Sequence, residues 1–159
     1  MSEQRSSLRL AKGAAKGLRV GIVTAAFNGS ITARLRRSVS SRLGALGAAK
    51  ADLLHQDVPG ALELPLACQS LAAQGGVDAV IALGCVIRGE TSHYDLVCQG
   101  AVQGIVRAGQ STGVPIIFGV LTCDTPAQAL ARCSGSRDAG RHAADAAVWM
   151  AHLLGGRHG

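Results

Sequence analysis

The chain has 159 residues, of which 48% are hydrophobic and 16% charged, and its net charge is +6. This length and balance predict one soluble globular domain and exclude a disordered chain. No apolar stretch is long enough to cross a bilayer, and no apolar h-region follows the basic N-terminal residues. The sequence therefore predicts neither a membrane span nor a secretory signal.

The first 17 residues differ in composition from the rest of the chain. They carry a net charge of +3 and few large apolar side chains, which predicts a flexible, solvated arm. An arm that faces an anion or bridges two subunits is the alternative. We therefore divide the sequence into a flexible basic arm (1–17), a single domain (18–155) and a short tail (156–159).

Five cysteines stand at positions 68, 85, 98, 123 and 133, without a CxxC pair and without a histidine at metal-ligand spacing. An odd, scattered set predicts reduced thiols and hence a cytoplasmic protein, rather than disulfides or a metal site. Cys68, Cys85 and Cys98 lie in apolar stretches, which favours a role as small core residues for these three.

The first half of the chain alternates strand-like and helical stretches. Residues 18–25 form a β-branched run that ends in Phe-Asn-Gly, which predicts a strand followed by a turn. Apolar residues recur with helical spacing over 31–46, and a weaker strand is predicted over 52–58, before Pro-Gly. Residues 64–73 are predicted to be a helix, since Pro65 falls in its first turn.

The second half repeats this alternation. Residues 78–83 are an apolar run typical of a buried parallel strand, and a helix is predicted over 95–108. A fourth strand is predicted over 115–121. Two further helices are expected over 126–132 and 138–154.

This order of elements predicts an α/β fold in which helices cover both faces of a four-stranded parallel sheet. Gly100 and Gly104, four residues apart in a predicted helix, permit close backbone packing. Ligands of such folds bind beyond the carboxyl ends of the strands, so the segments that follow the strands are candidate sites. A four-stranded sheet leaves long edges and a limited core, so we also expect a homo-oligomer.

The segment GCVIRGETSHYD, residues 84–95, joins the third strand to a helix and concentrates polar side chains. Gly89, Thr91 and the free amides before the helix form a candidate anion cradle. His93 is the only histidine in a predicted strand-to-helix loop, and an imidazole exchanges protons near neutral pH. A structural histidine in front of a helix capped by Asp95 fits the pattern equally well.

Weaker signals come from other residues predicted to lie at the same end of the sheet. Phe27 and Phe118 lie near the ends of predicted strands, where they can stack on a planar ring or fill the core. Glu63 follows a Pro-Gly turn at a helix start, where it can bind a ligand or complement the helix dipole. Arg132 ends a helix and can bind an anion, although interaction with the helix dipole is the commoner role.

Four segments carry the strongest pattern: RVGIVTAAFNGSITARL at 19–35, VPGALELPLACQSLA at 58–72, DAVIALGCVIRGETSHYDLVCQGA at 78–101, and GVPIIFGVLTCDTPAQALAR at 113–132. In this order they resemble the lumazine synthase family of riboflavin biosynthesis. The resemblance extends over nearly all of residues 18–154. The GCVIRGETSHYD stretch is highly specific to that family.

The resemblance implies a three-layer, flavodoxin-like α/β sandwich with strand order 2-1-3-4. It also implies a transferase that condenses 5-amino-6-(D-ribitylamino)uracil with 3,4-dihydroxy-2-butanone 4-phosphate. The products are 6,7-dimethyl-8-ribityllumazine, phosphate and water. Each stage of this reaction moves protons and none moves electrons, so we expect neither a metal nor a cofactor.

The family's binding residues carry over to matching positions of this chain. The resemblance implies that Phe27 stacks on the pyrimidine ring, while two groups of three residues hold the ribityl chain and the uracil edge. The ribityl group is held by Ala61, Leu62 and Glu63, and the uracil edge by the backbone of Cys85, Val86 and Ile87.

The resemblance also implies which residues bind the phosphate and which residue transfers protons. Glu90 and Thr91 help to bind the phosphate through main chain and hydroxyl, and Arg132 adds a charge-assisted contact. His93 is implied to transfer protons. Phe118 is implied to come from a neighbouring subunit, so the resemblance places the site between chains.

The chain departs from the family's common pattern after the phosphate arginine. Many members carry Lys or His before a Gly in the next loop, whereas residues 138–140 here read Asp-Ala-Gly, with one residue fewer. Arg137 and Arg141 are the nearby candidates to compensate. The resemblance implies a pentamer at least, with a decamer or a 60-subunit shell as larger forms, and residues 7–10 are a candidate strand for a neighbour's sheet.

Three other functions fit these residues less well. A non-catalytic relative, such as a cage or binding protein, predicts loss of His93 or Arg132, and both are present. A nucleotide-binding domain favours a Gly-rich loop after the first strand, where this chain has AAFNGS. Few aromatic residues and a charge concentrated in the arm argue against nucleic acid. We expect small-molecule substrates, and neither nucleic acid nor membrane as a partner.

Overall fold

The computed structural model describes residues 8–155, in which strands and helices alternate along the chain as predicted. Its four strands are all parallel and lie in the order β2-β1-β3-β4. They are β1 (Val20–Ala25), β2 (Leu53–Val58), β3 (Ala79–Ile87) and β4 (Ile116–Cys123). The predicted flavodoxin-like α/β fold with strand order 2-1-3-4 is confirmed.

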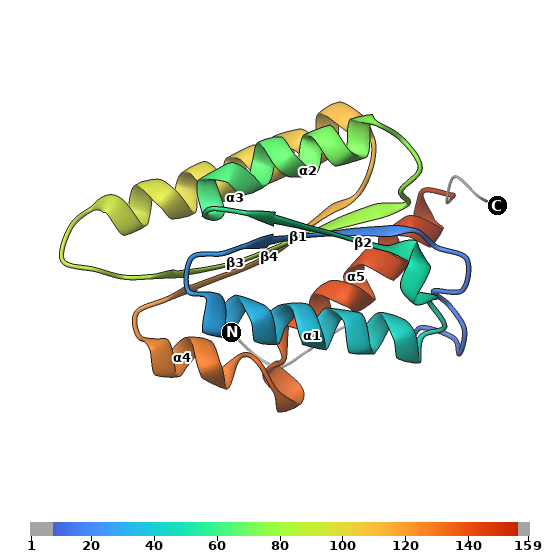
Figure 1. Ribbon diagram of the computed structural model, residues 1–159, viewed down its shortest axis with the longest axis horizontal. Coiled ribbons are helices and arrows are strands. Elements are labelled where there is room, and N and C mark those ends of the chain that lie inside the picture. The colour runs from blue at the N-terminus through green and yellow to red at the C-terminus, as the bar shows by residue number, and fades with distance from the viewer. Residues whose placement is uncertain (1–7, 156–159) are drawn as a thin grey trace.

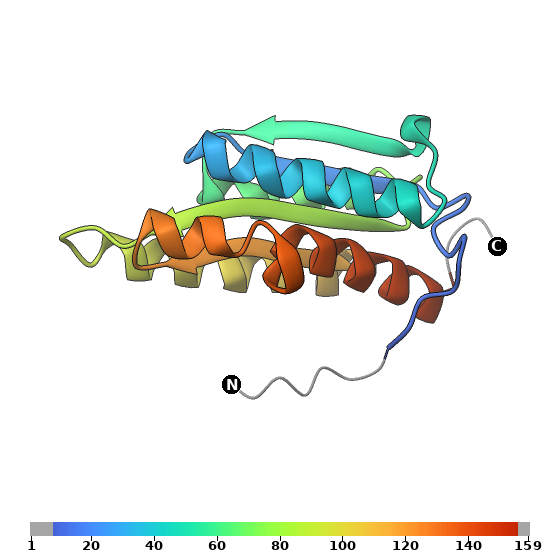
Figure 2. The ribbon, with the colours of Figure 1, turned by 90° about the horizontal axis from the view of Figure 1, so that it is seen from below.

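Helices cover both faces of this sheet, so that the molecule has three layers (Figure 1). On one face lie α2 (Leu64–Ala73) and α3 (His93–Thr112). On the other lie α1 (Gly29–Ala45) and α5 (Ala139–Leu153), which run side by side in Figure 2. The short α4 (Pro126–Ala131) lies on the α1 side as well.

Single 3₁₀ turns complete the connections: η1 (Lys50–Asp52), η2 (Ala61–Glu63) and η3 (Gly135–Arg137). The carboxyl ends of the strands all meet at one edge, because every strand is parallel to its neighbours. In Figure 1 this edge lies at the left, where α1, α3 and α4 also begin. The loops that leave this edge hold most of the candidate residues.

Apolar side chains of the strands form one cluster on each face of the sheet. Ile22, Ile81 and Leu83 pack with α1 and α5, whereas Val23 and Val80 pack with α2 and α3. The alternation of side chains along a strand sends neighbours to opposite faces, and helices cover both faces. This is why the central strands read as continuous apolar runs in the sequence.

Close helix contact at two glycines of α3 is confirmed. A Cβ at Gly104 would lie 2.6 Å from a side-chain atom of Pro65, and one at Gly100 would lie 2.8 Å from Leu62. The absence of these side chains lets α3 approach α2 and η2. The position of the residue 61–63 turn therefore depends on the two glycines.

Some predicted boundaries are wrong in a way that affects the site. Strand β3 continues four residues past Leu83, to Ile87, because residues 84–87 pair with β4. Helix α3 begins at His93 and is preceded by Ser92, so Asp95 lies inside the helix and is not its N-cap. The prediction ended the strand before Gly84, although residues 85–87 are apolar, and it began the helix only at Asp95, because residues 88–94 are mostly polar.

The packed structure begins before Leu18, the predicted start of the domain. Ala15 is fully buried, and its backbone N–H donates to Leu46 O at 2.9 Å. The Ala14 carbonyl lies 2.6 Å from His152 Nε2. Residues 8–10 form no strand within the chain, and residue 7 and the tail 156–159 lie outside the described residues.

A first prediction concerns the contact of α1 with α5 at Gly140, where a Cβ would lie 2.7 Å from Leu35 O and 2.8 Å from Ser38 Cβ. We expect Gly140→Ala to lower the free energy of unfolding by about 1–3 kcal/mol, because the two helix backbones must separate. Urea denaturation measures the change. The control is Gly44→Ala on α1, where the added Cβ meets open space; unchanged stability of Gly140→Ala would contradict the prediction.

Candidate active site

The loops after β1 and β2 are joined by backbone hydrogen bonds at the carboxyl edge of the sheet. The N–H of Ala26 donates to Val58 O at 2.7 Å, and that of Phe27 donates to Pro59 O at 3.0 Å. These bonds continue the β1–β2 ladder past the ends of both strands. Phe27 is thereby held beside the Pro-Gly turn, and its side chain is 71% exposed.

The turn after β2 brings three predicted ribityl-binding residues to the same edge. Ala61 is buried, whereas Leu62 and Glu63 are exposed. The Glu63 carboxylate lies over Gly60, where a Cβ would come within 3.2 Å of its Oε2. Gly60 thus leaves room for this carboxylate, and both polar and apolar groups face solvent at the turn.

The last residues of β3 have one open backbone edge. Pairing of β1 with β3 ends at Thr24 and Leu83, whereas β3 continues to Ile87 along β4. The Asn28 side-chain amide donates to Cys85 O at 2.8 Å, so this carbonyl points toward the β1 side. Because backbone groups alternate along a strand, those of Ile87 face the same open side.

Asn28 adopts the left-handed conformation (φ 56°), which places its side chain under the end of β3. Asparagine tolerates this region better than most residues do. Asn28 lies in a predicted candidate segment but had no predicted role in the site, although an Asn-Gly pair after a strand is the signal for such a turn. The residue links the loop after β1 to the end of β3.

Arg88 links the loop after β3 to the loop after β4. Its backbone N–H donates to Cys123 O at 2.9 Å, and its Nε donates to Asp124 Oδ1 at 2.8 Å. Its guanidinium also lies 3.7 Å from Asp95 Oδ1 and 4.3 Å from the centre of the Tyr94 ring. Exposed ion pairs contribute little stability each. Because Arg88 contacts both Tyr94 and Asp95, its main effect is to position the first turn of α3.

His93 is the first residue of α3 and is exposed. Its backbone N–H donates to the Thr91 hydroxyl at 3.3 Å. Among residues 8–155, no hydrogen bond uses the backbone N–H groups of residues 89–92, which precede the positive end of a 20-residue helix. Loop 88–92 projects beyond the rest of the edge in Figures 1 and 2, so these donors face solvent.

Arg132 follows α4 and is exposed. One guanidinium nitrogen donates to Gln128 O at 2.9 Å. This contact is an interaction with the end of α4, which was the alternative predicted role of Arg132. Burial raises the pKa of Cys123, and the nearby Arg132 charge partly opposes this effect. Arg132 therefore lies within electrostatic reach of the carboxyl end of β4.

Phe118 was predicted to lie near the carboxyl end of its strand. The structure places it elsewhere. It is the third residue of β4 and pairs with Ala82, well before the end of the sheet. β4 is an edge strand, and the Phe118 side chain is 37% exposed. Within one chain, Phe118 is separated along the strand from the loops that carry Phe27 and His93.

Arg137 and Arg141, the basic residues on either side of 138–140, lie in different surroundings. Arg141 lines a groove between α1 and α5, and Arg137 lies exposed in η3. Asp138 caps α5, accepting a hydrogen bond from the Arg141 backbone N–H at 3.2 Å. The aspartate in this loop thus has a local structural role.

The five cysteines are free thiols. Burial raises the pKa of Cys68 to about 12; the pKa of Cys85 is also raised to about 12, by burial first and then by Cys123 and Cys133. Cys98 is only half-buried, so its predicted core role is met in part. All five are held as neutral thiols at neutral pH.

Because of these thiols, we expect the folded protein to lose stability at alkaline pH. In the unfolded chain a thiol titrates near 9.0, whereas in the fold Cys68 and Cys85 titrate near 12. Between these values the unfolded chain releases protons that the folded chain retains, so stability falls as pH rises from 9 toward 12. Urea midpoints across this range measure the effect. Cys68→Ala should flatten the decline, and an unchanged slope in that variant would contradict this cause.

Between residues 8 and 155, no helix is both long enough and apolar enough to cross a membrane. The same residues contain no cluster of three or more His, Cys, Asp or Glu side chains placed to hold a metal ion.

The fold and the open carboxyl edge define a flavodoxin-like α/β protein with a candidate small-molecule site at the ends of β1, β2 and β3. A model of the 6,7-dimethyl-8-ribityllumazine synthase family matches residues 17–155. The chain belongs to this family, a family of transferases in riboflavin biosynthesis.

Curated proteins named 6,7-dimethyl-8-ribityllumazine synthase are almost half identical to this chain over the aligned residues. The protein of Cupriavidus metallidurans is 49% identical over 139 residues, which are 87% of this chain and 80% of the relative. That of Ralstonia pickettii is 49% identical over 87% of this chain and 81% of its own length. That of Paracidovorax citrulli is 47% identical over 86% of this chain and 87% of its own.

Proposed function

We propose that this chain condenses 5-amino-6-(D-ribitylamino)uracil with 3,4-dihydroxy-2-butanone 4-phosphate, forming 6,7-dimethyl-8-ribityllumazine, phosphate and water. The observation that carries the proposal is the open edge of β3 beside Phe27, in a chain of the lumazine synthase family. A planar heterocycle with donors and acceptors along one side fits such an edge. The exposed ring of Phe27 offers a surface for stacking.

The uracil substrate is proposed to lie along the end of β3. Its polar edge lies against Cys85, Val86 and Ile87 and pairs with the backbone groups of Ile87, which face the open side. The backbone of Val86 faces β4, so Val86 contributes more through its half-buried side chain. The ribityl hydroxyls reach the adjacent turn, where Ala61, Leu62 and Glu63 lie.

The phosphate of the second substrate is proposed to bind before α3. The free amides of Glu90 and its neighbours, the Thr91 hydroxyl and the helix dipole all favour an anion there. Arg132 adds a charge-assisted, potentially bidentate contact. The Glu90 carboxylate is expected to point away, because a like charge beside phosphate is unfavourable.

His93 is proposed to move the protons of the reaction. The amine of the uracil attacks the ketone, and one water leaves as a Schiff base forms. Elimination of phosphate then leaves a carbonyl group, and the ribityl-bearing nitrogen closes the ring onto it with loss of a second water. Holding both reactants in one site supplies much of the acceleration. A general acid–base residue adds about 10²–10⁴-fold.

The active enzyme is proposed to be a cytoplasmic homopentamer at least, with a decamer or a 60-subunit shell as larger forms. Large apolar side chains remain exposed on α2, α3, the turn before α2 and the β4 edge. They are Leu62, Leu66, Leu96, Val102, Val106 and Phe118. Contact between copies would bury them, and Phe118 would then complete a neighbour's pocket. Five free thiols agree with a reducing compartment.

One assay tests the reaction directly. The full-length protein is mixed with both substrates, and formation of the fluorescent lumazine is followed. Each substrate alone is the control. Absence of product with both substrates, in a protein that is folded by circular dichroism, would overturn the proposal. Light scattering on the same sample distinguishes a pentamer from a shell.

A complementation experiment tests the shared site. Phe118→Ala chains lack the ring that completes the neighbour's pocket, and we expect them to be about tenfold or more slower at low uracil concentration. His93→Ala chains lack the proton-transfer group. When the two are co-expressed in equal amounts, about one quarter of the interfaces pair an intact His93 with an intact Phe118 of the neighbour.

Activity of the mixed oligomer is therefore expected near one quarter of wild type, well above the mean of the two separate variants. An activity equal to that mean would place Phe118 and His93 in the same chain's site. Mixing the two purified proteins without subunit exchange is the control, and it should give only the mean.

A further inference from the structure

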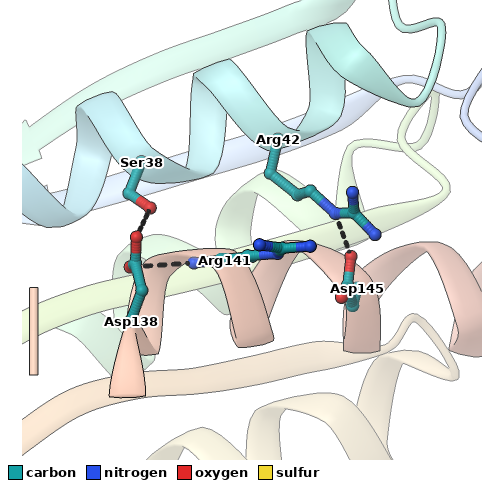
Figure 3. A network of polar contacts seen from close by, with 5 residues as sticks. All are labelled: Ser38, Arg42, Asp138, Arg141 and Asp145. Carbon is teal, nitrogen blue, oxygen red and sulfur yellow. Dashed lines mark hydrogen bonds and ion pairs between the residues drawn. The ribbon is translucent and has the colours of Figure 1, made fainter. Parts of the chain in front are cut away.

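A groove lined by arginines runs between α1 and α5, on the sheet face opposite α2 and α3. Its volume is about 540 Å³. The helices lie side by side in Figure 2, and Figure 3 shows polar side chains from both meeting between them. The lining side chains are Arg34, Arg37, Ser38, Ser41 and Arg42 of α1, with Cys133, Asp138 and Arg141.

Two carboxylates, those of Asp138 and Asp145, lie in and beside this groove, and both accept hydrogen bonds from neighbouring residues. Asp138 accepts hydrogen bonds from the Ser38 hydroxyl at 2.5 Å and from the Arg141 backbone N–H at 3.2 Å. Asp145 accepts from Arg42 Nε at 2.6 Å (Figure 3). Within residues 8–155, Asp138 forms no ion pair and Asp145 forms one with Arg42 alone.

Arg34, Arg37 and Arg141 are left without an acidic partner among residues 8–155. All three are exposed and line the same groove. Arg34 and Arg37 are one helical turn apart on α1, so their side chains lie on the same side of the helix. Arg141 approaches from α5, with its guanidinium between the helices in Figure 3. Counting Arg42, Asp138 and Asp145, the groove carries a net charge of +2.

We propose that this groove is a second anion site, which binds a small molecule with two or more linked phosphates. Guanidinium groups match phosphate oxygens with paired, charge-assisted hydrogen bonds. Three of them on two helices exceed what one phosphate needs, and the Ser41 hydroxyl adds a further donor. The two carboxylates on the α5 side disfavour a long phosphodiester chain.

This site is separate from the one proposed for the substrate phosphate. Arg132 directs a guanidinium nitrogen to Gln128 O and is not among the residues that line the groove, although Cys133 is. The exposed apolar residues that we assign to contacts between copies lie on α2, α3 and the β4 edge. The groove lies on the opposite helix layer, between α1 and α5.

Calorimetric titration of the full-length protein with inorganic pyrophosphate, in phosphate-free buffer, tests the proposal. We expect Arg34→Gln/Arg37→Gln to weaken binding by about a hundredfold or more, since two charge-assisted contacts are lost. The matched control is Lys16→Gln/Lys50→Gln, which removes the same charge from exposed lysines outside the groove. It should retain wild-type affinity, and both double variants should retain lumazine formation.

Arg132→Ala distinguishes the two sites. It should leave pyrophosphate binding in the groove unchanged. If Arg132→Ala abolishes binding while Arg34→Gln/Arg37→Gln does not, pyrophosphate occupies the substrate site and the proposal is wrong. Equal weakening by the groove variant and the lysine control would show that net charge alone attracts the anion, and would also overturn it. Tighter binding of a short oligonucleotide than of pyrophosphate would assign the groove to nucleic acid instead.

Discussion

Replacing His93 with alanine is expected to slow lumazine formation at saturating substrates by about 10²–10⁴-fold, without abolishing it. His93 is exposed at the first position of α3, so its loss leaves no cavity and no unpaired buried group. The residual rate comes from the oriented binding of two substrates, which the variant keeps. Single-turnover fluorescence measures the chemical steps apart from product release.

The matched control is His55→Ala, which removes an exposed imidazole from the edge strand β2, away from the loops of the site. This variant should keep the wild-type rate. His93→Gln retains a hydrogen-bonding group but cannot exchange a proton near neutral pH, so it should be about as slow as His93→Ala. An unchanged rate in His93→Ala would remove the residue from proton transfer, and recovery in His93→Gln would reduce its role to hydrogen bonding.

Arg132→Ala is expected to raise the KM for the butanone phosphate by about tenfold to a hundredfold, which is the value of one charge-assisted contact. The KM for the uracil substrate should change little, because its proposed contacts lie on β1, β2 and β3. Steady-state rates with one substrate varied at a time measure the two constants. A selective loss of uracil affinity would count against the assignment.

Arg132→Lys separates charge from geometry. A lysine keeps the positive charge but cannot form the two parallel hydrogen bonds of a guanidinium, so its KM should lie between wild type and Arg132→Ala. Because Arg132 also bonds to Gln128 O at the end of α4, thermal unfolding of each variant is needed alongside. A KM change that follows the loss of thermal stability across the variants would indicate a structural role.

Much of the fold could be predicted because its signals are local. The apolar runs around Ile22 and Ile81 and the helical spacing of apolar residues in α1 depend only on nearby residues. Strand–helix alternation then restricts the topology to a parallel sheet with right-handed crossovers. The strand order itself came from the resemblance to the family, and the observed sheet agrees with it.

The candidate site was predictable in composition but not in geometry. Residues 84–95 were predicted to be one connecting segment, whereas in the structure they are the end of β3, a short loop and the first turn of α3. Pairing with β4 decides where β3 ends, and the partner residues are more than 30 positions away in the sequence. Asn28 and Arg88 were missed as positioning residues for the same reason, since Cys85 and Asp124 are distant in sequence.

The sequence by itself determined the classes of element, the two apolar faces of the sheet and the chemical groups near its carboxyl edge, because periodicity and residue type are local properties. Only the tertiary structure decided that β3 extends past β1, that His93 begins a helix, and that Phe118 lies near the start of β4 rather than at its carboxyl end. The segment that contains His93 is thus defined by strand pairing and by the contacts of Arg88. Both depend on packing between residues far apart in the chain, which no local pattern records.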